Sequence, residues 1–468
     1  MARILLIRTS LEDKFNCNLT PPLGLMYIAA VLLQNKKHAV RIIDAKVCKV
    51  KDKVILENIK GFNPEFIGIS SLTTEMEVLH NLTAEIRQHG YCNPIIVGGA
   101  HASACPEDIM NDPNIDFAVI GEGEKAFPDL INILENKTGK LEEIGGIAFK
   151  NKCGQIKITP GQNIQDLDQI PFPRWDLVEL DKYTKGRSFI RLKHSKLHMA
   201  LITSRGCSFE CSFCHNIFGK KFRWRSPENV LSEIKILYHQ HSIRYFEILD
   251  DCFNYNIGRM NEICDLIIRE KMDITLTFPN GLRGDMLNDE SINKLYQAGT
   301  RMISFAPESG SPDIQKSMGK NVNLLKLQQV ISKAVKTGIH AHGFFIIGFT
   351  EEKQDDINKT LSFAVNSDLH TAAFYILNPF PGTRVYERLK KEGKINVLNF
   401  SRKNYCNFHK AFGELDLNSL VSFQRKCYFK FYISEKRFFN IFNGPIIKAS
   451  DFLYYFLFFI KRAVFRTV

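Results

Sequence analysis

Three cysteines in one short run could hold a metal cluster that keeps an open coordination position. Cys207, Cys211 and Cys214 have the spacing C-x3-C-x2-C. Closed electron-transfer clusters are usually held by four cysteines. Three thiolates leave one iron of a cubane cluster free to bind a substrate or cofactor, as the open position does at catalytic zinc sites. The spacing therefore predicts a reactive [4Fe-4S] cluster.

A zinc site built from the three cysteines and His215 is the alternative for the same run. Cys214 and His215 are adjacent, which is awkward for two ligands of one tetrahedral ion, and no second CxxC pair follows. Under this alternative the chain would be a zinc-dependent, non-enzymatic binding protein.

Buried strands must position the cysteine loop. The apolar segment Met199–Thr203 directly precedes it and predicts a strand. Five further strands, with helical patterns between them, are predicted at Tyr245–Leu249, Thr275–Phe278, Met302–Ala306, His340–Ile347 and Ala373–Leu377. This alternation predicts a partial (βα)6 barrel, and barrels of this kind keep their chemistry at the carboxyl ends of the strands.

The N-terminal third also alternates strands and helices. Strands are predicted at Ala2–Ile7, Ala39–Ile43, Phe66–Ser70, Pro94–Val97 and Phe117–Ile120. This pattern is typical of a Rossmann-like, doubly wound parallel sheet, so the fold class is α/β. Small or polar residues follow these strands at Asp44, Ser70, Ser71, Thr73, Gly98, Gly99, Gly121, Glu122 and Gly123. Such residues let a nucleotide-like ligand approach the backbone in the crevice at the strand ends.

With Phe213 in the aromatic place of C-x3-C-x-aromatic-C, the cysteine run resembles the radical S-adenosylmethionine (SAM) enzymes. The N-terminal segments resemble the cobalamin-binding domain that precedes many radical SAM domains. The match includes Pro21–Leu25, the Gly98–His101 turn and the Gly-Glu-Gly-Glu element at Gly121–Glu124. The resemblance implies three cofactors, a [4Fe-4S] cluster, SAM and cobalamin, with the small strand-end residues above at the cobalamin. The alternative is a degenerate domain that binds no corrin.

One departure from the cobalamin pattern concerns the cobalt ligand. Cobalamin mutases carry D-x-H-x-x-G, but the corresponding segment here is Asp44-Ala45-Lys46-Val47-Cys48-Lys49, without the histidine. Many cobalamin-type radical SAM enzymes lack it too, so we expect cobalt without a histidine ligand from this position. His101 is a second candidate, although we expect it to contact a neighbouring backbone group or a cofactor amide.

The resemblance also implies SAM contacts at the strand ends of the barrel. Asp251 would face the SAM amino group, Arg283 the carboxylate, Glu308 and Ser309 the ribose, and Glu351 the adenine. Phe344 replaces the first glycine of the adenine motif, so that match is partial. Taken singly, acidic residues at these places are often helix N-caps.

In this family SAM is cleaved to a 5′-deoxyadenosyl radical, and most cobalamin-dependent members are methyltransferases. We therefore expect methylation of an unactivated carbon in a small-molecule or lipid-like substrate, with an external electron donor such as flavodoxin or ferredoxin. No catalytic acid or base can be assigned. A second hypothesis for the function is cyclisation, rearrangement or oxidation of the substrate without methyl transfer. A third is a tRNA-modifying radical SAM enzyme. We do not expect a nucleic-acid partner, because no appended basic RNA-binding module or second cluster motif is present.

The composition of the chain indicates its cellular compartment, and the order of its motifs indicates its domain boundaries. The 468 residues carry a net charge of +12 and 12 cysteines, most of them scattered singly. Such cysteines do not form a disulfide framework, which predicts a reducing, cytoplasmic location. We expect a cobalamin-binding domain at 1–140, a linker with a small hairpin at 141–192, the radical SAM barrel at 193–400 and a helical, aromatic and basic region at 401–468.

The last region holds a nine-residue apolar run at Phe452–Ile460. Spanning a bilayer takes about 20 residues. Flanking lysines and arginines suit an interfacial helix on anionic lipid, which predicts peripheral contact with the inner face of the membrane. The alternative is a helix packed on the barrel.

Overall fold

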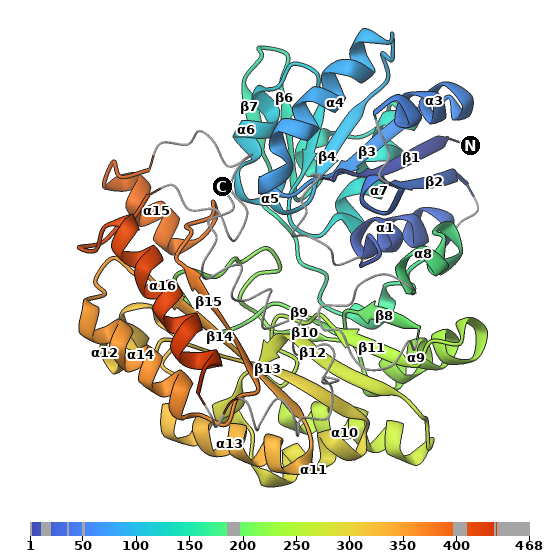
Figure 1. The fold of residues 1–468 in the computed structure, drawn as a ribbon. Coiled ribbons are helices and arrows are strands. Elements are labelled where there is room, and N and C mark those ends of the chain that lie inside the picture. The colour runs from blue at the N-terminus through green and yellow to red at the C-terminus, as the bar shows by residue number, and fades with distance from the viewer. Residues whose placement is uncertain are drawn as a thin grey trace.

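The structure, a computed structural model, describes residues 2–10, 20–34, 37–48, 52–184, 197–395, 410–434 and 437. Two parallel sheets organise these residues, one in the upper and one in the lower half of Figure 1. The chain enters the upper sheet first and then builds the lower one. This confirms the predicted fold class, a Rossmann-like domain followed by a partial barrel.

The upper sheet has seven strands in the order β2-β1-β3-β4-β5-β6-β7. Their bounds are β1 Arg3–Arg8, β2 Ala39–Asp44, β3 Phe66–Ser70, β4 Ile95–Gly98, β5 Phe117–Val119, β6 Ile147–Lys150 and β7 Ile156–Ile158. The first five pair in parallel, whereas the hairpin β6–β7 joins them antiparallel. The hairpin expected in the linker thus extends this sheet.

Helices cover both faces of the upper sheet. Within β1, Ile4 and Leu6 pack in one apolar cluster and Leu5 and Ile7 in another. A strand buried on both faces reads as a continuous apolar run, which is why the N-terminal strand was visible in the sequence. The helices of this half are α1 Leu23–Gln34, α2 Ala45–Cys48, α3 Asp52–Phe62, α4 Met76–Gln88, α5 Ala100–Ala104, α6 Pro106–Asn111, α7 Gly123–Asn136 and α8 Leu180–Thr184.

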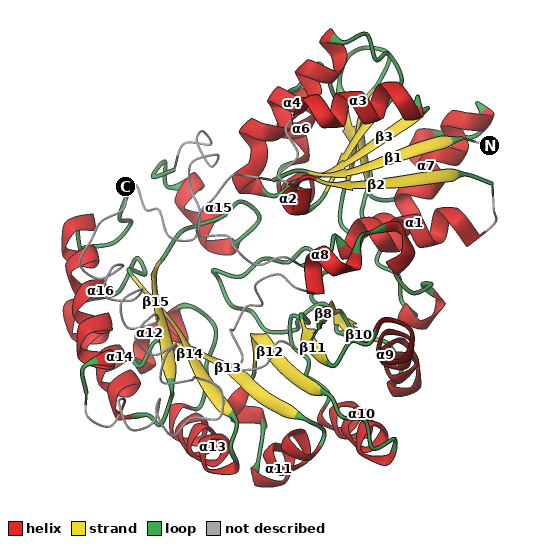
Figure 2. Cartoon of the chain, turned by 45° about the vertical axis from the view of Figure 1, so that its right-hand side comes forward, coloured by secondary structure: helices red, strands yellow, loops and turns green. Residues whose placement is uncertain are grey.

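The lower sheet has six parallel strands in the order β15-β14-β13-β12-β11-β8. They are β8 His198–Leu201, β11 Tyr245–Ile248, β12 Thr275–Leu282, β13 Thr300–Glu308, β14 His340–Ile347 and β15 Thr371–Ile376. Figure 2 shows this sheet curving as an open half-barrel with helices on its outer side. The helices of this half up to residue 391 are α9 Pro227–His241, α10 Ile257–Arg269, α11 Asp289–Gln297, α12 Pro312–Ser317, α13 Leu324–Thr337, α14 Gln354–Asn366 and α15 Arg384–Lys391.

Strands β12 and β13 are longer than expected. The register shifts between Phe278 and Leu282 and again between Phe305 and Glu308, close to the carboxyl end of each strand. A bulge at a strand end bends the chain and re-aims its side chains. The candidate site residues on these strands therefore belong to the strand ends themselves.

Helix α16, Leu417–Tyr432, packs along β15, the edge strand of the barrel (Figure 1). Three of its side chains, one turn apart, bond the free edge of that strand. Gln424 donates to the Phe374 carbonyl at 2.7 Å, and the Tyr428 hydroxyl accepts from the Phe374 amide at 3.1 Å. The Tyr432 hydroxyl accepts from the Ala372 amide at 3.0 Å and donates to the Ala372 carbonyl at 2.8 Å. Helix α16 thereby covers an edge that could otherwise pair with another chain.

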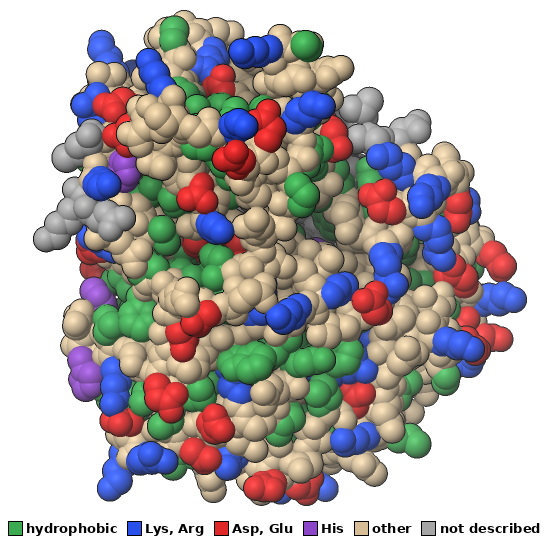
Figure 3. Space-filling model, turned by 180° about the vertical axis from the view of Figure 1, so that it is seen from behind, with side chains coloured by type: hydrophobic (Ala, Val, Ile, Leu, Met, Phe, Trp, Pro, Cys, Tyr) green, Lys and Arg blue, Asp and Glu red, His purple; other side chains and the backbone are tan. Residues whose placement is uncertain are grey.

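The predicted interfacial helix around Phe452–Ile460 lies outside the described residues. Within the ranges that the structure describes, no helix combines the length and the apolar character needed to span a bilayer. On the face drawn in Figure 3, the described lysines and arginines are interspersed with aspartates and glutamates. That face does not present the continuous basic stripe that typically contacts nucleic acid.

The bonds from α16 to β15 lead to a prediction. Tyr432→Phe leaves the buried Ala372 amide and carbonyl without their partner, which costs about 1–3 kcal/mol. We expect faster hydrogen exchange at Ala372 by about tenfold or more. Phe429→Tyr, on the exposed side of the same helix, is the matched control and should change nothing. Equal exchange in both variants would show that the hydroxyl does not hold the edge.

Candidate functional site

The cysteine loop is held at its base by a short antiparallel pair, β9 Ser204–Arg205 and β10 Arg223–Trp224. Gly206 has a φ of +83°, and a Cβ there would lie 2.5 Å from the Lys221 carbonyl oxygen. Only glycine fits this left-handed position. The tight turn directs the chain from β9 into the cysteine run.

The far end of the loop is fixed to the barrel. The Ser212 amide donates to the Met318 carbonyl at 2.8 Å, and the Val385 amide donates to the Ser212 carbonyl at 2.9 Å. The loop is thus tied to α12 and α15, two helices that follow strands β13 and β15. These bonds fix the position of the backbone that carries the three cysteines.

A fourth cysteine, Cys252, lies beside the loop and was not identified from the sequence as part of the site. Its buried thiol hydrogen-bonds the Cys207 sulfur, and this bond lowers the pKa of Cys207 to about 7. A lowered pKa favours the thiolate that metal ligation requires. The signal was available, since Cys252 directly follows Asp251 at the end of β11.

The zinc alternative is not favoured by the donor geometry. Within the described part of the chain, no three histidine, cysteine, aspartate or glutamate side chains are arranged to hold one metal ion. His215 lies 3.8 Å from Asp251, measured between Nε2 and Oδ1. Three thiolates spread over different irons of a cubane do not need to converge on one ion.

Two predicted SAM contacts surround the loop. Asp251 accepts a hydrogen bond from the Gly206 amide at 3.2 Å, so its carboxylate lies at the start of the cysteine run. Arg283 is held by Asp285, with 2.7 Å between Nε and Oδ1, and its guanidinium stacks over Phe209 at 4.1 Å. The buried Nη1 of Arg283 has no hydrogen-bond partner among the described residues. An unpartnered guanidinium nitrogen beside the loop suits an anionic group such as a carboxylate.

The two predicted ribose contacts, Glu308 and Ser309, lie in different environments. Glu308 has a φ of 62°, which is strained for a residue other than glycine and typical of functional sites. Its carboxylate pairs with Lys320 at 2.8 Å, and that ammonium lies 5.8 Å from the Phe213 ring of the cysteine motif. Ser309 is fully buried and its hydroxyl contacts Thr360 at 3.0 Å, which indicates a structural role. Sequence reasoning missed Lys320, a cation placed between the ribose element and the cluster loop.

Glu351, the predicted adenine contact, is partly exposed, whereas the adjacent Glu352 is buried. The Glu351 carboxylate accepts from Arg388 at 2.7 Å and from Ser317 at 2.9 Å on the exposed side of the turn. Glu352 is the buried residue, accepting from the Gly348 and Phe349 amides, and burial raises its pKa to about 7. Glu352 therefore shapes the turn after β14. Glu351 remains an adenine-site prediction that its ion pair does not support.

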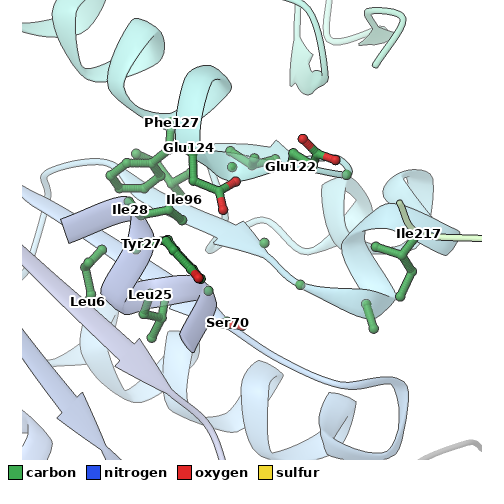
Figure 4. Close-up of a pocket in the computed structure, with 18 of the residues that line it drawn as sticks. Leu6, Leu25, Tyr27, Ile28, Ser70, Ile96, Glu122, Glu124, Phe127 and Ile217 are labelled. Carbon is green, nitrogen blue, oxygen red and sulfur yellow. The ribbon is translucent and has the colours of Figure 1, made fainter. Parts of the chain in front are cut away.

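A cavity of about 230 Å³ opens at the carboxyl ends of the upper strands. Figure 4 shows Ile28 of α1 next to Phe127 of α7, the Tyr27 side chain extending towards Ser70, and Ile217 on the opposite side. The remaining lining residues from the barrel half are Ile202, Arg205 and Phe218. The cavity therefore lies where the two halves of the chain meet, and the cysteine loop contributes to its wall.

Glycines form the floor of this cavity. Gly98, Gly99, Gly121 and Gly123 all line it, as does Ser70. At Gly99, with a φ of +100°, a Cβ would lie 2.7 Å from the Ser71 carbonyl oxygen. Small side chains at these positions leave room for a ligand to approach the backbone, and their contact with cobalamin stays a prediction. An apolar cavity above a glycine floor suits a planar part of a large cofactor such as cobalamin.

Three other predicted cobalamin contacts are engaged with the protein. Asp44 is buried and bonded through both oxygens to Arg8, and Tyr183 of α8 donates to it at 2.6 Å. Thr73 contacts Nδ1 of His101 at 3.3 Å, and Nε2 of the same ring lies 2.9 Å from Asp108. His101 is thus held on both ring nitrogens by side chains, which does not favour it as a cobalt ligand.

Glu122 and Glu124, on the Gly-Glu-Gly-Glu element, point at two arginines of the cysteine-loop base. Arg205 pairs with Glu124 and lies 3.4 Å from Glu122, and Arg223 pairs with Glu122. All four side chains are at most 6% exposed. We call this four-residue group the interdomain charge cluster. It joins the turn after β5 to the strands that flank the cysteines.

The chain thus combines a Rossmann-like domain with a barrel that carries a three-cysteine loop, and buried charges join the two. Known protein families match both parts. A B12 binding domain model matches residues 18–131, and a Radical SAM superfamily model matches residues 201–364. The chain is 31% identical over 449 residues to the uncharacterized methyltransferase PH0819 of Pyrococcus horikoshii, covering 95% of this chain and 92% of that protein. The chain therefore belongs to the radical SAM enzymes that carry an N-terminal cobalamin-binding domain.

The chain is also similar to a cyclase in sequence and to a methyltransferase in structure. An anaerobic magnesium-protoporphyrin IX monomethyl ester cyclase of Rubrivivax gelatinosus is 26% identical over 394 residues, covering 82% of this chain and 69% of that protein. The radical SAM methyltransferase TsrM of Kitasatospora setae superposes with a TM-score of 0.72 at 18% identity, covering 84% of this chain and 76% of that one. At that identity the structure supports the fold alone. The family uses a [4Fe-4S] cluster, SAM and cobalamin, and the cysteine loop and glycine-floored cavity fit these groups.

The interdomain charge cluster generates a stability prediction. Glu122→Gln leaves Arg223 buried without its ion pair, and removing one partner of a buried pair costs about 3–5 kcal/mol. We expect a lower thermal midpoint and weaker retention of cluster iron. Asp176→Asn, which breaks the exposed Arg174–Asp176 pair, is the control and should cost less than about 1 kcal/mol. Similar melting curves for both variants would contradict a structural role of the charge cluster.

The cavity generates a binding prediction. Gly24 of α1 lines the cavity, whereas Gly61 of α3 does not. At both glycines an added Cβ would have no heavy atom within 4 Å, so both positions have room for a larger side chain. Gly24→Trp should weaken cobalamin binding by about tenfold or more, or about 1.4 kcal/mol, by occupying the cavity mouth. Gly61→Trp should bind normally. Corrin absorbance after anaerobic titration with hydroxocobalamin measures both, and equal affinities would place the corrin elsewhere.

Proposed function

We propose that this enzyme transfers a methyl group to an unactivated carbon of a small-molecule or lipid-like substrate. One observation carries the proposal. Arg205 lines the cobalamin-side cavity and is two residues before Cys207, so the two cofactor sites share one wall. Chemistry that passes a group between two cofactors needs them at one substrate. When bound, SAM and cobalamin supply the radical and the methyl group.

The protein's own residues hold and orient these groups. Cys207, Cys211 and Cys214 ligate the cluster. Arg283 offers its buried Nη1 to the SAM carboxylate, and Glu308 accepts from the ribose hydroxyls while Lys320 holds its carboxylate in place. Apolar side chains form most of the cavity lining and limit the access of water, which would otherwise quench a reactive intermediate.

The reaction needs reducing conditions and an electron. We propose a cytoplasmic enzyme served by a protein reductant of the flavodoxin or ferredoxin kind. Membrane contact through residues 401–468 stays a prediction, since only residues 410–434 and 437 of that region are described and those of α16 pack on the barrel.

Anaerobic turnover with methyl-labelled SAM tests the proposal. We expect labelled product and 5′-deoxyadenosine from reconstituted enzyme with candidate lipids and natural-product precursors. Cys207→Ala, Cys211→Ala and Cys214→Ala should each reduce SAM cleavage at least 100-fold, whereas Cys264→Ala, in the buried core of α10, should retain it. Cleavage unaffected by all three loop substitutions would refute the proposal.

A cyclisation or oxidation without methyl transfer is the second candidate, and it is favoured by the likeness to the R. gelatinosus cyclase. Both reactions begin with the same radical, so the cluster variants cannot separate them. The label does. Product formed with 5′-deoxyadenosine but without labelled methyl would select the second candidate.

A further inference from the structure

An aromatic patch lies beside the cysteine loop. Ser208, Phe222, Trp224 and Tyr255 line a shallow pocket of about 500 Å³, with Lys221 at its rim. The chain has two tryptophans, and Trp224 is 44% exposed whereas Trp175 is 6% exposed. Exposed tryptophan is typical of the centres of protein–protein interfaces. We call these five residues the aromatic patch.

The patch is continuous with the cluster loop. Trp224 stacks on Phe222 with 5.5 Å between ring centroids, and Phe222 contacts Tyr255 at 4.9 Å. Tyr255 meets the edge of Phe209 at 5.8 Å, and Phe209 lies between Cys207 and Cys211. A chain of packed rings thus leads from solvent to the backbone that holds the cluster.

The loop side of the patch is rigid. The Ser208 hydroxyl donates to the Lys220 carbonyl at 2.8 Å, and the Lys220 ammonium donates to the Phe209 carbonyl at 2.7 Å. Arg283 covers the other side of Phe209. A preorganised surface loses little entropy when a partner docks.

The charge of the patch selects the partner. Among the described residues that line the pocket, Lys221 is the charged one and none is a carboxylate. The whole chain carries a net charge of +12, which favours an acidic partner and speeds its approach.

We propose that the aromatic patch is the docking site of the electron donor, an acidic one-electron carrier of the flavodoxin or ferredoxin class. The inference rests on the proposed function, because SAM cleavage needs a reduced cluster. Each event moves one electron: the reduced carrier is oxidised by one electron, and the cluster passes from the 2+ to the 1+ state. Docking at the patch places the carrier next to the loop without opening the cavity to water.

A paired charge-reversal and truncation experiment tests the site. Lys221→Glu/Trp224→Ala should raise the KM for reduced flavodoxin at least tenfold, and turnover driven by dithionite should stay within twofold of the parent enzyme. Leu325→Ala/Lys326→Glu, on α13, makes the same kinds of change at another exposed site and is the matched control. Calorimetric binding of oxidised flavodoxin to the holoenzyme should weaken only in the first variant.

The outcomes separate this inference from the proposed function. Unchanged flavodoxin KM and binding in Lys221→Glu/Trp224→Ala would overturn the docking site while dithionite turnover still supported the reaction. Equal weakening in the α13 control would also overturn it, by showing a general charge effect. Loss of dithionite turnover in the patch variant would assign the patch to the integrity of the cluster loop instead.

Discussion

The interdomain charge cluster is the interaction on which the site depends. Four buried charges, two from each half of the chain, meet where desolvation is expensive. Such a group is stable only when every partner is present and correctly placed. Since Arg205 directly precedes Gly206 and the cysteine run, the constraint that joins the halves also fixes where the cluster loop begins. The cobalamin side and the cluster side are therefore aligned by one set of contacts.

This arrangement changes the meaning of the Gly-Glu-Gly-Glu element. Its glycines line the cavity floor, as a ligand-binding turn would. Its glutamates line the same cavity, and their carboxylates also pair with arginines about 80 to 100 residues later, as Glu124 does with Arg205. One turn thus lines the cavity and also joins the first domain to the second through ion pairs. A pattern of small and acidic residues cannot distinguish these two uses without the partner in view.

The regular parts of the fold were predictable because their signals are local. Strand β14 was predicted with its observed bounds, and all six barrel strands were located, since each is a short apolar run. The cysteine triplet was equally visible. What the sequence did not reveal depends on contacts between distant segments. Cys252 meets Cys207 only because β11 lies beside β8, and Glu352 rather than Glu351 is buried because of how the turn after β14 closes. Helix α16 likewise packs on β15 through side-chain hydrogen bonds to backbone atoms that lie about 50 to 60 residues earlier in the chain.

The cysteine loop has to serve two opposite requirements. Radical chemistry needs a site from which water is excluded, whereas reduction needs contact with a carrier that arrives through water. These demands are compatible only if the two events use different sides of the same backbone. The loop offers such a separation, because Arg205 lines the cavity between the two halves while Ser208 lines the shallow patch, three residues later. The left-handed turn at Gly206 lies between them, and no other residue type fits there. A substitution at Gly206 would therefore displace both Arg205 at the cavity and Ser208 at the patch. The same turn thus positions the residues that line the cavity and those that line the proposed docking site.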